Sequence, residues 1–294
     1  MPSPPILLAA PNVSEGRDRS AVEAIGAAFT PARLLDVHSD ADHNRSVFTL
    51  AAPQGELAAA LVSGAREVVA RIDLRRHDGL HPHVGALDVA PVVYLEERAR
   101  GAAVAEALTA GALIGEELEL PVVLYGQLAT AEGTRERAAI RAGGPAALAR
   151  RIESGELRPD YGPARAHPSA GAVLVTARPP LVAFNVELAS AELELARSVA
   201  AALRESGGGL PGVRAIGLYL PATGRAQVSF NVEDHRAVPL RELVEAVRAL
   251  APIAEAELVG LAPGAALEGF PEDVPLRGFD PSRHLIENAV ASER

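Results

Sequence analysis

Short apolar runs alternate with longer alanine-rich segments along the first half of this chain, and this alternation constrains its fold more than any other feature. The runs Ile6–Ala10, Val47–Ala51 and Ala86–Tyr94 have the length and composition of strands, whereas Gly55–Ile72 and Arg98–Leu118 have the spacing of helices. Strands that alternate with helices indicate an α/β fold. The other expected elements are strands at Arg33–Val37, Val122–Tyr125 and Ala172–Thr176, helices at Ser20–Phe29 and Pro145–Glu153, and a loop at Gly162–Gly171.

The second half reads as strand, helix, two strands, helix and strand, which is the split βαβ arrangement of ferredoxin-like modules. The bend at Arg178-Pro179-Pro180 favours a boundary between two subdomains, residues 1–178 and 179–294. We therefore expect an α/β (α+β) fold in which each subdomain has a mixed β-sheet with helices on the outer face. The elements expected in the second subdomain are strands at Leu181–Glu187, Val213–Leu220, Ala226–Asn231 and Ala256–Val259 and helices at Ala191–Glu205 and Pro239–Ala251.

The composition excludes several kinds of chemistry. The chain has no cysteine, and all 28 of its Lys and Arg residues are arginine, so thiolate nucleophiles, Schiff-base lysines and a P-loop lysine are absent. A formal net charge of −10 argues against nucleic acid as a partner. No apolar run approaches the roughly 20 residues needed to span a bilayer, and the apolar start lacks a basic region. These features predict a cytoplasmic protein without membrane partners.

Two polar loops contain five of the eight histidines, Asp36–Arg45 and His77–Ala86. Loops at strand ends often carry functional groups on a rigid scaffold. His81 is a candidate general acid/base, because only histidine titrates near neutral pH without perturbation; turn chemistry on a solvated loop is the alternative. A metal site at His77, His81 and His83 is disfavoured, since Gly79 and Pro82 interrupt the spacing that chelation needs. We expect no metal.

Several stretches, in order along the chain, resemble the formiminotransferase family. They are Pro11-Asn-Val-Ser-Glu-Gly-Arg17, Asp42-His-Asn-Arg-Ser-Val-Phe-Thr49, His81-Pro-His-Val-Gly-Ala-Leu-Asp-Val-Ala-Pro91, Val122-Val-Leu-Tyr-Gly126, Ala139-Ile-Arg-Ala-Gly143, Pro159-Asp-Tyr-Gly-Pro163, Val182-Ala-Phe-Asn-Val186 and Gly278-Phe-Asp-Pro-Ser-Arg-His-Leu-Ile-Glu287. The resemblance implies a homodimer of two-subdomain chains with a substrate tunnel between the subdomains. It also implies transfer of a formimino group from formimino-glutamate to the co-substrate tetrahydrofolate. Because the chain ends where the transferase domain of the family ends, we expect a separate cyclodeaminase.

The resemblance also implies site residues. It makes His81 the catalytic histidine, which would take a proton from N5 of tetrahydrofolate and deliver one to the departing glutamate nitrogen. The folate-binding loop of the family matches Gly162, Pro163, Ala164, Arg165, Ala166, His167, Pro168, Ser169, Ala170 and Gly171.

Substrate-binding candidates lie on the first polar loop and after the first strand. Arg45 and Asn44 can hold a carboxylate, or Arg45 can instead tie down the neighbouring acidic turn. Asn12 and Glu15 can face the substrate or cap a helix. His38 stands where familiar family members have an acid.

The folate-binding loop also departs from the family, which has an aromatic residue at the position of Ala170 and an apolar one at that of His167. Asp88 is expected to lie in a buried strand, either as a structural carboxylate or as one that supports the residues of the site.

Three alternatives remain open from the sequence. The first is a related formyl transfer to or from glutamate, for which the His81 loop would look the same. The second is a folate-binding protein without turnover. The third is a metal-dependent hydrolase that uses His77, His81 and His83.

Overall fold

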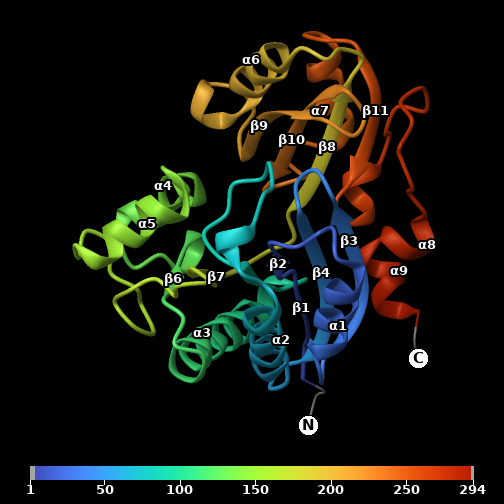
Figure 1. The fold of residues 1–294 in the computed structure, drawn as a ribbon. Coiled ribbons are helices and arrows are strands. Elements are labelled where there is room, and N and C mark those ends of the chain that lie inside the picture. The colour runs from blue at the N-terminus through green and yellow to red at the C-terminus, as the bar shows by residue number, and fades with distance from the viewer. Residues whose placement is uncertain (1–3, 293–294) are drawn as a thin grey trace. The chain divides into compact units, whose positions relative to one another are not determined.

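The computed structural model describes residues 4–292, and the chain divides into two compact units (Figure 1). The first unit ends at Pro179 and the second begins at Pro180. Residues 1–3 and 293–294, at the outer ends of the two expected subdomains, lie outside the described residues. Within the described part of the chain, no helix is both long enough and apolar enough to cross a bilayer.

The first unit contains a seven-stranded sheet, which is mixed, as predicted. Its order is β1-β4-β2-β5-β7-β6, with β3 added beside β4. The pairs β5–β7 and β6–β7 are parallel and the other pairs are antiparallel. The strands are β1 (Ile6–Ala9), β2 (Asn12–Val13), β3 (Arg33–Asp40), β4 (Arg45–Pro53), β5 (Leu87–Val93), β6 (Val122–Leu124) and β7 (Val173–Arg178).

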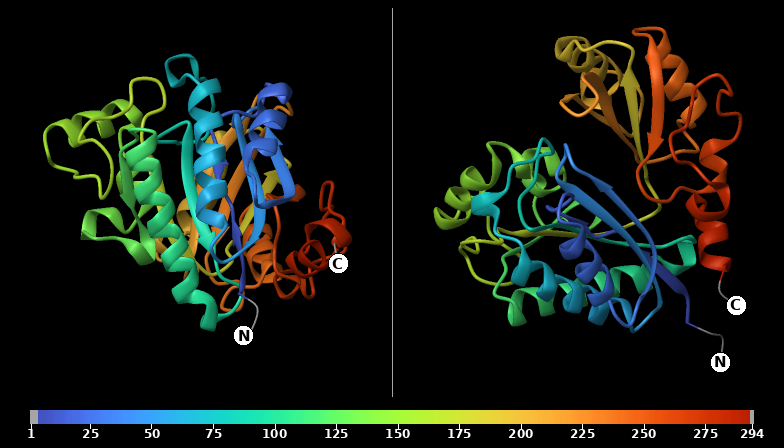
Figure 2. Two further views of the ribbon diagram at one scale, coloured as in Figure 1. Left: turned by 90° about the horizontal axis from the view of Figure 1, so that it is seen from below. Right: turned by 45° about the vertical axis from the view of Figure 1, so that its right-hand side comes forward.

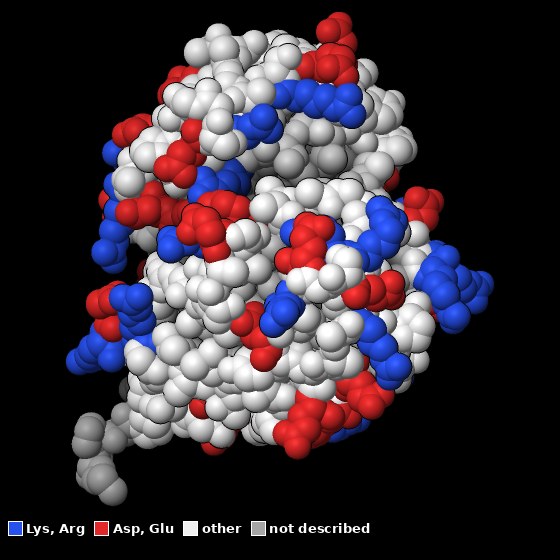
Figure 3. All heavy atoms as spheres, turned by 90° about the vertical axis from the view of Figure 1, so that its left-hand side faces the viewer, with Lys and Arg blue, Asp and Glu red and all other residues white. Residues whose placement is uncertain are grey.

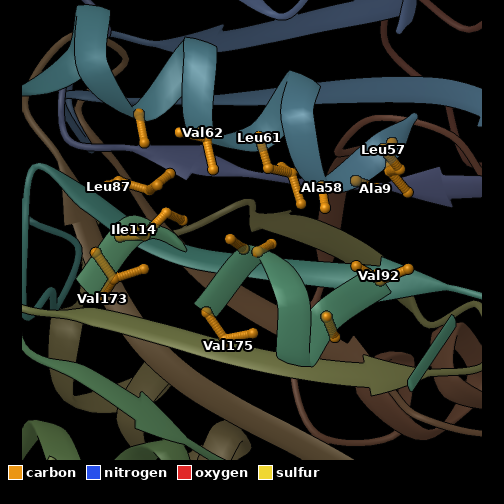
Figure 4. Packing of buried hydrophobic residues seen from close by; sticks show 14 of the residues in the cluster. Ala9, Leu57, Ala58, Leu61, Val62, Leu87, Val92, Ile114, Val173 and Val175 are labelled. Carbon is orange, nitrogen blue, oxygen red and sulfur yellow. The ribbon is translucent and has the colours of Figure 1, made fainter. Parts of the chain in front are cut away.

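Helices pack against both faces of this sheet. The helices α1 (Arg19–Ala28), α2 (Leu57–Arg71) and α3 (Arg100–Glu117) lie side by side along one face (Figures 1 and 2). Figure 4 shows part of the core beneath them, where side chains of α2 and α3 meet apolar side chains of the strands. A smaller cluster joins Leu148 and Ile152 of α5 (Gly144–Glu153) to Val89, Val123 and Leu174 of the sheet. The short helix α4 (Arg137–Arg141) precedes α5 and contributes to the same cluster.

The second unit has the predicted order of strands and helices. Its sheet runs β11-β8-β10-β9, and every pairing is antiparallel, so the prediction of a mixed sheet is wrong for this unit. The physical reason lies in the connections: each helical crossover skips one strand position, and the strand inserted there runs the opposite way. The elements are β8 (Val182–Leu188), α6 (Leu193–Leu203), β9 (Val213–Leu220), β10 (Arg225–Val232), α7 (Leu240–Arg248), β11 (Ile253–Leu258), α8 (Pro281–His284) and α9 (Ile286–Ala291).

Every strand and helix expected from the sequence is present, with ends that differ by a few residues. The sequence did not predict β2, α4, α8 or α9, because each is too short to show a period. The face drawn in Figure 3 carries acidic and basic side chains interspersed, without a large basic patch of the kind that nucleic acid requires.

Candidate active site

The loop that carries His81 is held at its end by main-chain contacts. Gly85 pairs with Gly171, and the carbonyl of Gly85 accepts a hydrogen bond from the Ser14 hydroxyl at 2.8 Å. A Cβ on Gly85 would lie 1.8 Å from the carbonyl oxygen of Ala172, so only glycine permits this approach. The close contact positions the His77–Ala86 loop beside the loop that ends at Gly171.

His81 presents an unprotonated ring nitrogen. Its Nδ1 lies 2.8 Å from the carbonyl oxygen of Pro82. Because a carbonyl only accepts, Nδ1 carries the proton, and in the neutral ring Nε2 keeps its lone pair. The half-buried imidazole is therefore arranged as a proton acceptor through Nε2.

A buried ion cluster lies next to this loop. Asp88 on β5 is fully buried, and its Oδ1 accepts the main-chain N–H of Val84 at 2.8 Å. Its Oδ2 pairs with Arg45 of β4 at 2.8 Å and with Arg141 at the end of α4. The Nε of Arg45 in turn donates to Oδ1 of Asn12 at 3.1 Å. Three segments that are distant in the sequence thus meet at one carboxylate, and Asn12 joins them through Arg45.

This environment shifts the pKa values of His81, Asp88 and Arg45. Burial, followed by the positive charges of Arg45 and Arg141, holds the pKa of His81 well below its ordinary value. Burial alone would raise the pKa of Asp88, but the two arginines keep it below its ordinary value. The pKa of Arg45 is lowered to about 10, chiefly by burial, although Asp88 opposes that effect. His81 is therefore neutral at pH 7, and Asp88 is ionised.

Three other histidines of the two polar loops form ring contacts, one of them with His81. The rings of His43 and His81 are 5.8 Å apart, and those of His77 and His83 meet edge to face at 4.6 Å. Burial is the largest cause of the lowered pKa of both His77 and His83. Among residues 4–292, no group of three His, Cys, Asp or Glu side chains is arranged to hold a metal ion.

The sequence-predicted substrate residues divide into two sets. Asn12 and Arg45 belong to the ion cluster beside His81. Glu15 and Asn44 instead bind main-chain groups. Glu15 accepts hydrogen bonds from the N–H groups of Arg17 and Asp18, which precede α1. The Oδ1 of Asn44 accepts a hydrogen bond from the N–H of Gly16 at 2.9 Å. The Asn44 amide nitrogen reaches His77 Nδ1 at 3.3 Å and the Asp78 carbonyl at 3.2 Å.

His38 lies on β3, opposite Val47 of β4 and in the same pair of strands as Arg45. Its position places it on the ladder that supports the ion cluster.

The loop from Gly162 to Gly171 is irregular, as predicted, and its end is a tight turn. Nδ1 of His167 accepts the main-chain N–H of Ala170 at 3.0 Å. The carbonyl of Ser169 accepts from Leu74 at 2.8 Å, and that of Ala170 accepts from Ala86 at 2.9 Å. Ala170 is buried in the main core, so the small residue at this position packs inward.

Arg141 belongs to the ion cluster beside His81, but its sequence position alone predicted no role for it. It lies in the family-like stretch Ala139-Ile-Arg-Ala-Gly143, which was its only signal. Its partner Asp88 is 53 residues away in the chain. Asp88 was expected to lie in a buried strand, either as a structural carboxylate or as one that supports the site residues; its burial on β5 confirms the location.

Comparison with known proteins identifies the class. The model of the formiminotransferase domain, N-terminal subdomain, matches residues 6–178, and that of the formiminotransferase domain matches residues 183–269. The chain belongs to the formiminotransferase family.

Relatives of two kinds resemble the chain. A glutamate formimidoyltransferase of Streptococcus pyogenes is 33% identical over 287 residues, which cover 95% of this chain and 96% of that protein. One of Thermoplasma acidophilum is 35% identical, with 92% of each chain covered. The formimidoyltransferase-cyclodeaminase of Gallus gallus is 39% identical over 87% of this chain, which spans only 50% of that longer protein.

Proposed function

We propose that this protein is a glutamate formimidoyltransferase, which transfers the formimino group of N-formimino-L-glutamate to N5 of tetrahydrofolate. The observation that carries the proposal is His81, a neutral imidazole with its Nε2 lone pair free, beside a cationic cluster. The names of relatives that match nearly the whole chain support the same activity.

His81 would move one proton. N5 of tetrahydrofolate attacks the formimino carbon, and the tetrahedral intermediate carries an excess proton on N5. Nε2 of His81 takes this proton and then delivers it to the glutamate nitrogen as the bond between that nitrogen and the formimino carbon breaks. An imidazolium with a lowered pKa is a strong donor to the leaving amine, and such proton transfer typically contributes about 10²–10⁴-fold.

We assign the folate-binding role to residues 162–171. The contacts of Ser169 and Ala170 with Leu74 and Ala86 support this assignment, because they bring that loop against the loop of His81. His167, whose Nδ1 accepts hydrogen bonds, has its ring proton on Nε2.

The proposal also covers the location, the oligomeric state and the subdomain boundaries of the protein. We infer a cytoplasmic homodimer whose two subdomains are residues 1–178 and 179–294. The product, 5-formimino-tetrahydrofolate, is a substrate for a cyclodeaminase, an activity that the name of the Gallus gallus relative includes.

A coupled assay tests the proposal. Purified protein is mixed with tetrahydrofolate, formimino-glutamate and a cyclodeaminase, and the absorbance of methenyl-tetrahydrofolate is followed. Wild type should turn over, and His81→Ala should lose about 10²–10⁴-fold in kcat. His284→Ala is the matched control, because within residues 4–292 this half-buried histidine of α8 accepts a main-chain N–H from Asp280 and stacks on Phe279, and is not part of the cluster beside His81. Turnover with N-formyl-glutamate but not with formimino-glutamate would refute the assigned donor.

A further inference from the structure

The cluster beside His81 carries more positive than negative charge. Asp88 pairs with both Arg45 and Arg141, and within residues 4–292 it is the only carboxylate that pairs with either. One carboxylate neutralises one guanidinium, so a full positive charge remains in a largely buried place. Arg137, also on α4, adds a third cation close enough to Arg45 to lower its pKa.

The two paired arginines differ in how completely they are bound. Arg45 is fixed by Asp88 through one terminal nitrogen and by Asn12 through Nε. Arg141 bonds Asp88 through one terminal nitrogen, whereas its buried Nε makes no hydrogen bond to any described residue. A buried donor without a partner costs about 1–3 kcal/mol, so an acceptor at this edge of the guanidinium would be stabilising.

We propose that Arg141, with Arg45 beside it, binds the α-carboxylate of the glutamate donor. The inference rests on the proposed function and adds the residue that recognises the donor. Arginine offers a planar fork that matches a carboxylate, and the excess charge of the cluster requires an anion.

Donor chemistry selects the α-carboxylate. The carbon that carries it also carries the glutamate nitrogen from which the formimino group departs, so an anion site next to His81 fits the α-carboxylate. Two methylene groups hold the γ-carboxylate farther from the reacting carbon. The carboxylates of tetrahydrofolate are farther still, because the whole p-aminobenzoyl group separates them from N5.

Binding at Arg141 also prepares the base. Burial, and after it the charges of Arg45 and Arg141, lower the pKa of His81 in the free protein. A bound carboxylate would offset one of these charges, and the pKa of His81 would rise toward its ordinary value. The imidazole would then be a better acceptor for the N5 proton when the donor is present.

The test measures binding without turnover, so that it is independent of the proposed activity. N-formyl-L-glutamate, its α-carboxamide and its γ-carboxamide are titrated calorimetrically, in the absence of tetrahydrofolate, into wild type, Arg141→Gln and Arg135→Gln. Arg135 is the matched control, because its exposed pair with Glu132 lies outside the cluster.

In wild type and Arg135→Gln, the α-carboxamide should bind about 10- to 100-fold more weakly than the acid. Arg141→Gln should bind the acid and the α-carboxamide equally weakly. An Arg141→Gln variant that still prefers the acid, a wild type that discriminates only against the γ-carboxamide, or a wild type that does not bind the acid overturns the assignment. The comparison of ligands on wild type needs no variant, so misfolding cannot obscure it. The coupled assay decides the activity separately.

Discussion

Asp88 accepts the main-chain N–H of Val84 with the oxygen that the arginines leave free, at 2.8 Å. Val84 follows His83 in the His77–Ala86 loop, so the carboxylate that pairs with Arg45 and Arg141 also fixes the backbone that carries His81. One buried side chain thereby sets both the charge around the imidazole and the position of its loop.

Replacing Asp88 with asparagine should destabilise the protein strongly. The change leaves two guanidinium groups in a buried site without a countercharge, and breaking such a pair costs about 3–5 kcal/mol. Urea unfolding measures this loss. Asp273→Asn is the control, because Asp273 pairs with Arg248 at the surface, and it should change stability by no more than about 0.5 kcal/mol. Equal effects of the two substitutions would contradict a special role for Asp88.

The stability of the protein should depend on pH through His81. In the folded state its pKa is well below the ordinary value of about 6.5 that it has when unfolded. Between these two values the unfolded state binds more protons, so this contribution to the unfolding free energy falls as the pH drops. The stability difference between wild type and His81→Gln should fall by up to about 1.4 kcal/mol per pH unit below pH 6.5. Unfolding curves collected at several pH values measure it; parallel pH dependences would show that the pKa is not lowered.

Replacing Gly85 with alanine should distort the His77–Ala86 loop that carries His81. The new Cβ would lie 1.8 Å from the carbonyl oxygen of Ala172, and the main chains must separate to admit it. We expect a loss of about 3 kcal/mol or more together with a large loss of activity. Gly101→Ala is the matched control, because Gly101 lies in α3 with open space around it, and this change should be neutral or slightly stabilising. A Gly85→Ala variant with normal stability and turnover would show that the loop has another way to pack.

Glu106 provides a test in which stability and activity separate. This buried side chain of α3 accepts the main-chain N–H groups of Gly55 and Ala58, at the start of α2, with its two oxygens. Glu106→Ala leaves both donors unpaired and should cost about 1–3 kcal/mol. The kcat and KM of the folded fraction should stay unchanged, since the carboxylate takes no part in the ion cluster. Chemical unfolding and the coupled assay, on the same preparation, measure the two effects.

Much of the fold followed from local pattern. Helical and strand periods are set by neighbouring side chains, so the long elements such as Gly55–Ile72 and Arg98–Leu118 were found in their places as α2 and α3. The order of elements in the second half predicted its ferredoxin-like arrangement. The sequence did not predict that every pair of neighbouring strands in this sheet is antiparallel, which results because each helical crossover leaves room for one strand of opposite direction. The histidine-containing loops and the family itself were also readable in the sequence.

The sequence by itself thus determined which residues form helices and strands, which loop carries His81 and which family the chain resembles. Only the tertiary structure decided the partners of the charged groups. Arg141 lies 53 residues from Asp88, and Glu106 lies 51 residues from Gly55. The spacing of apolar residues within one helix or strand cannot predict pairs so far apart in the chain. Burial makes them consequential, because a charge removed from water interacts strongly with whatever the fold places beside it. The state of His81 is therefore a property of the packed sheet and of α4 against it, which the loop sequence does not contain.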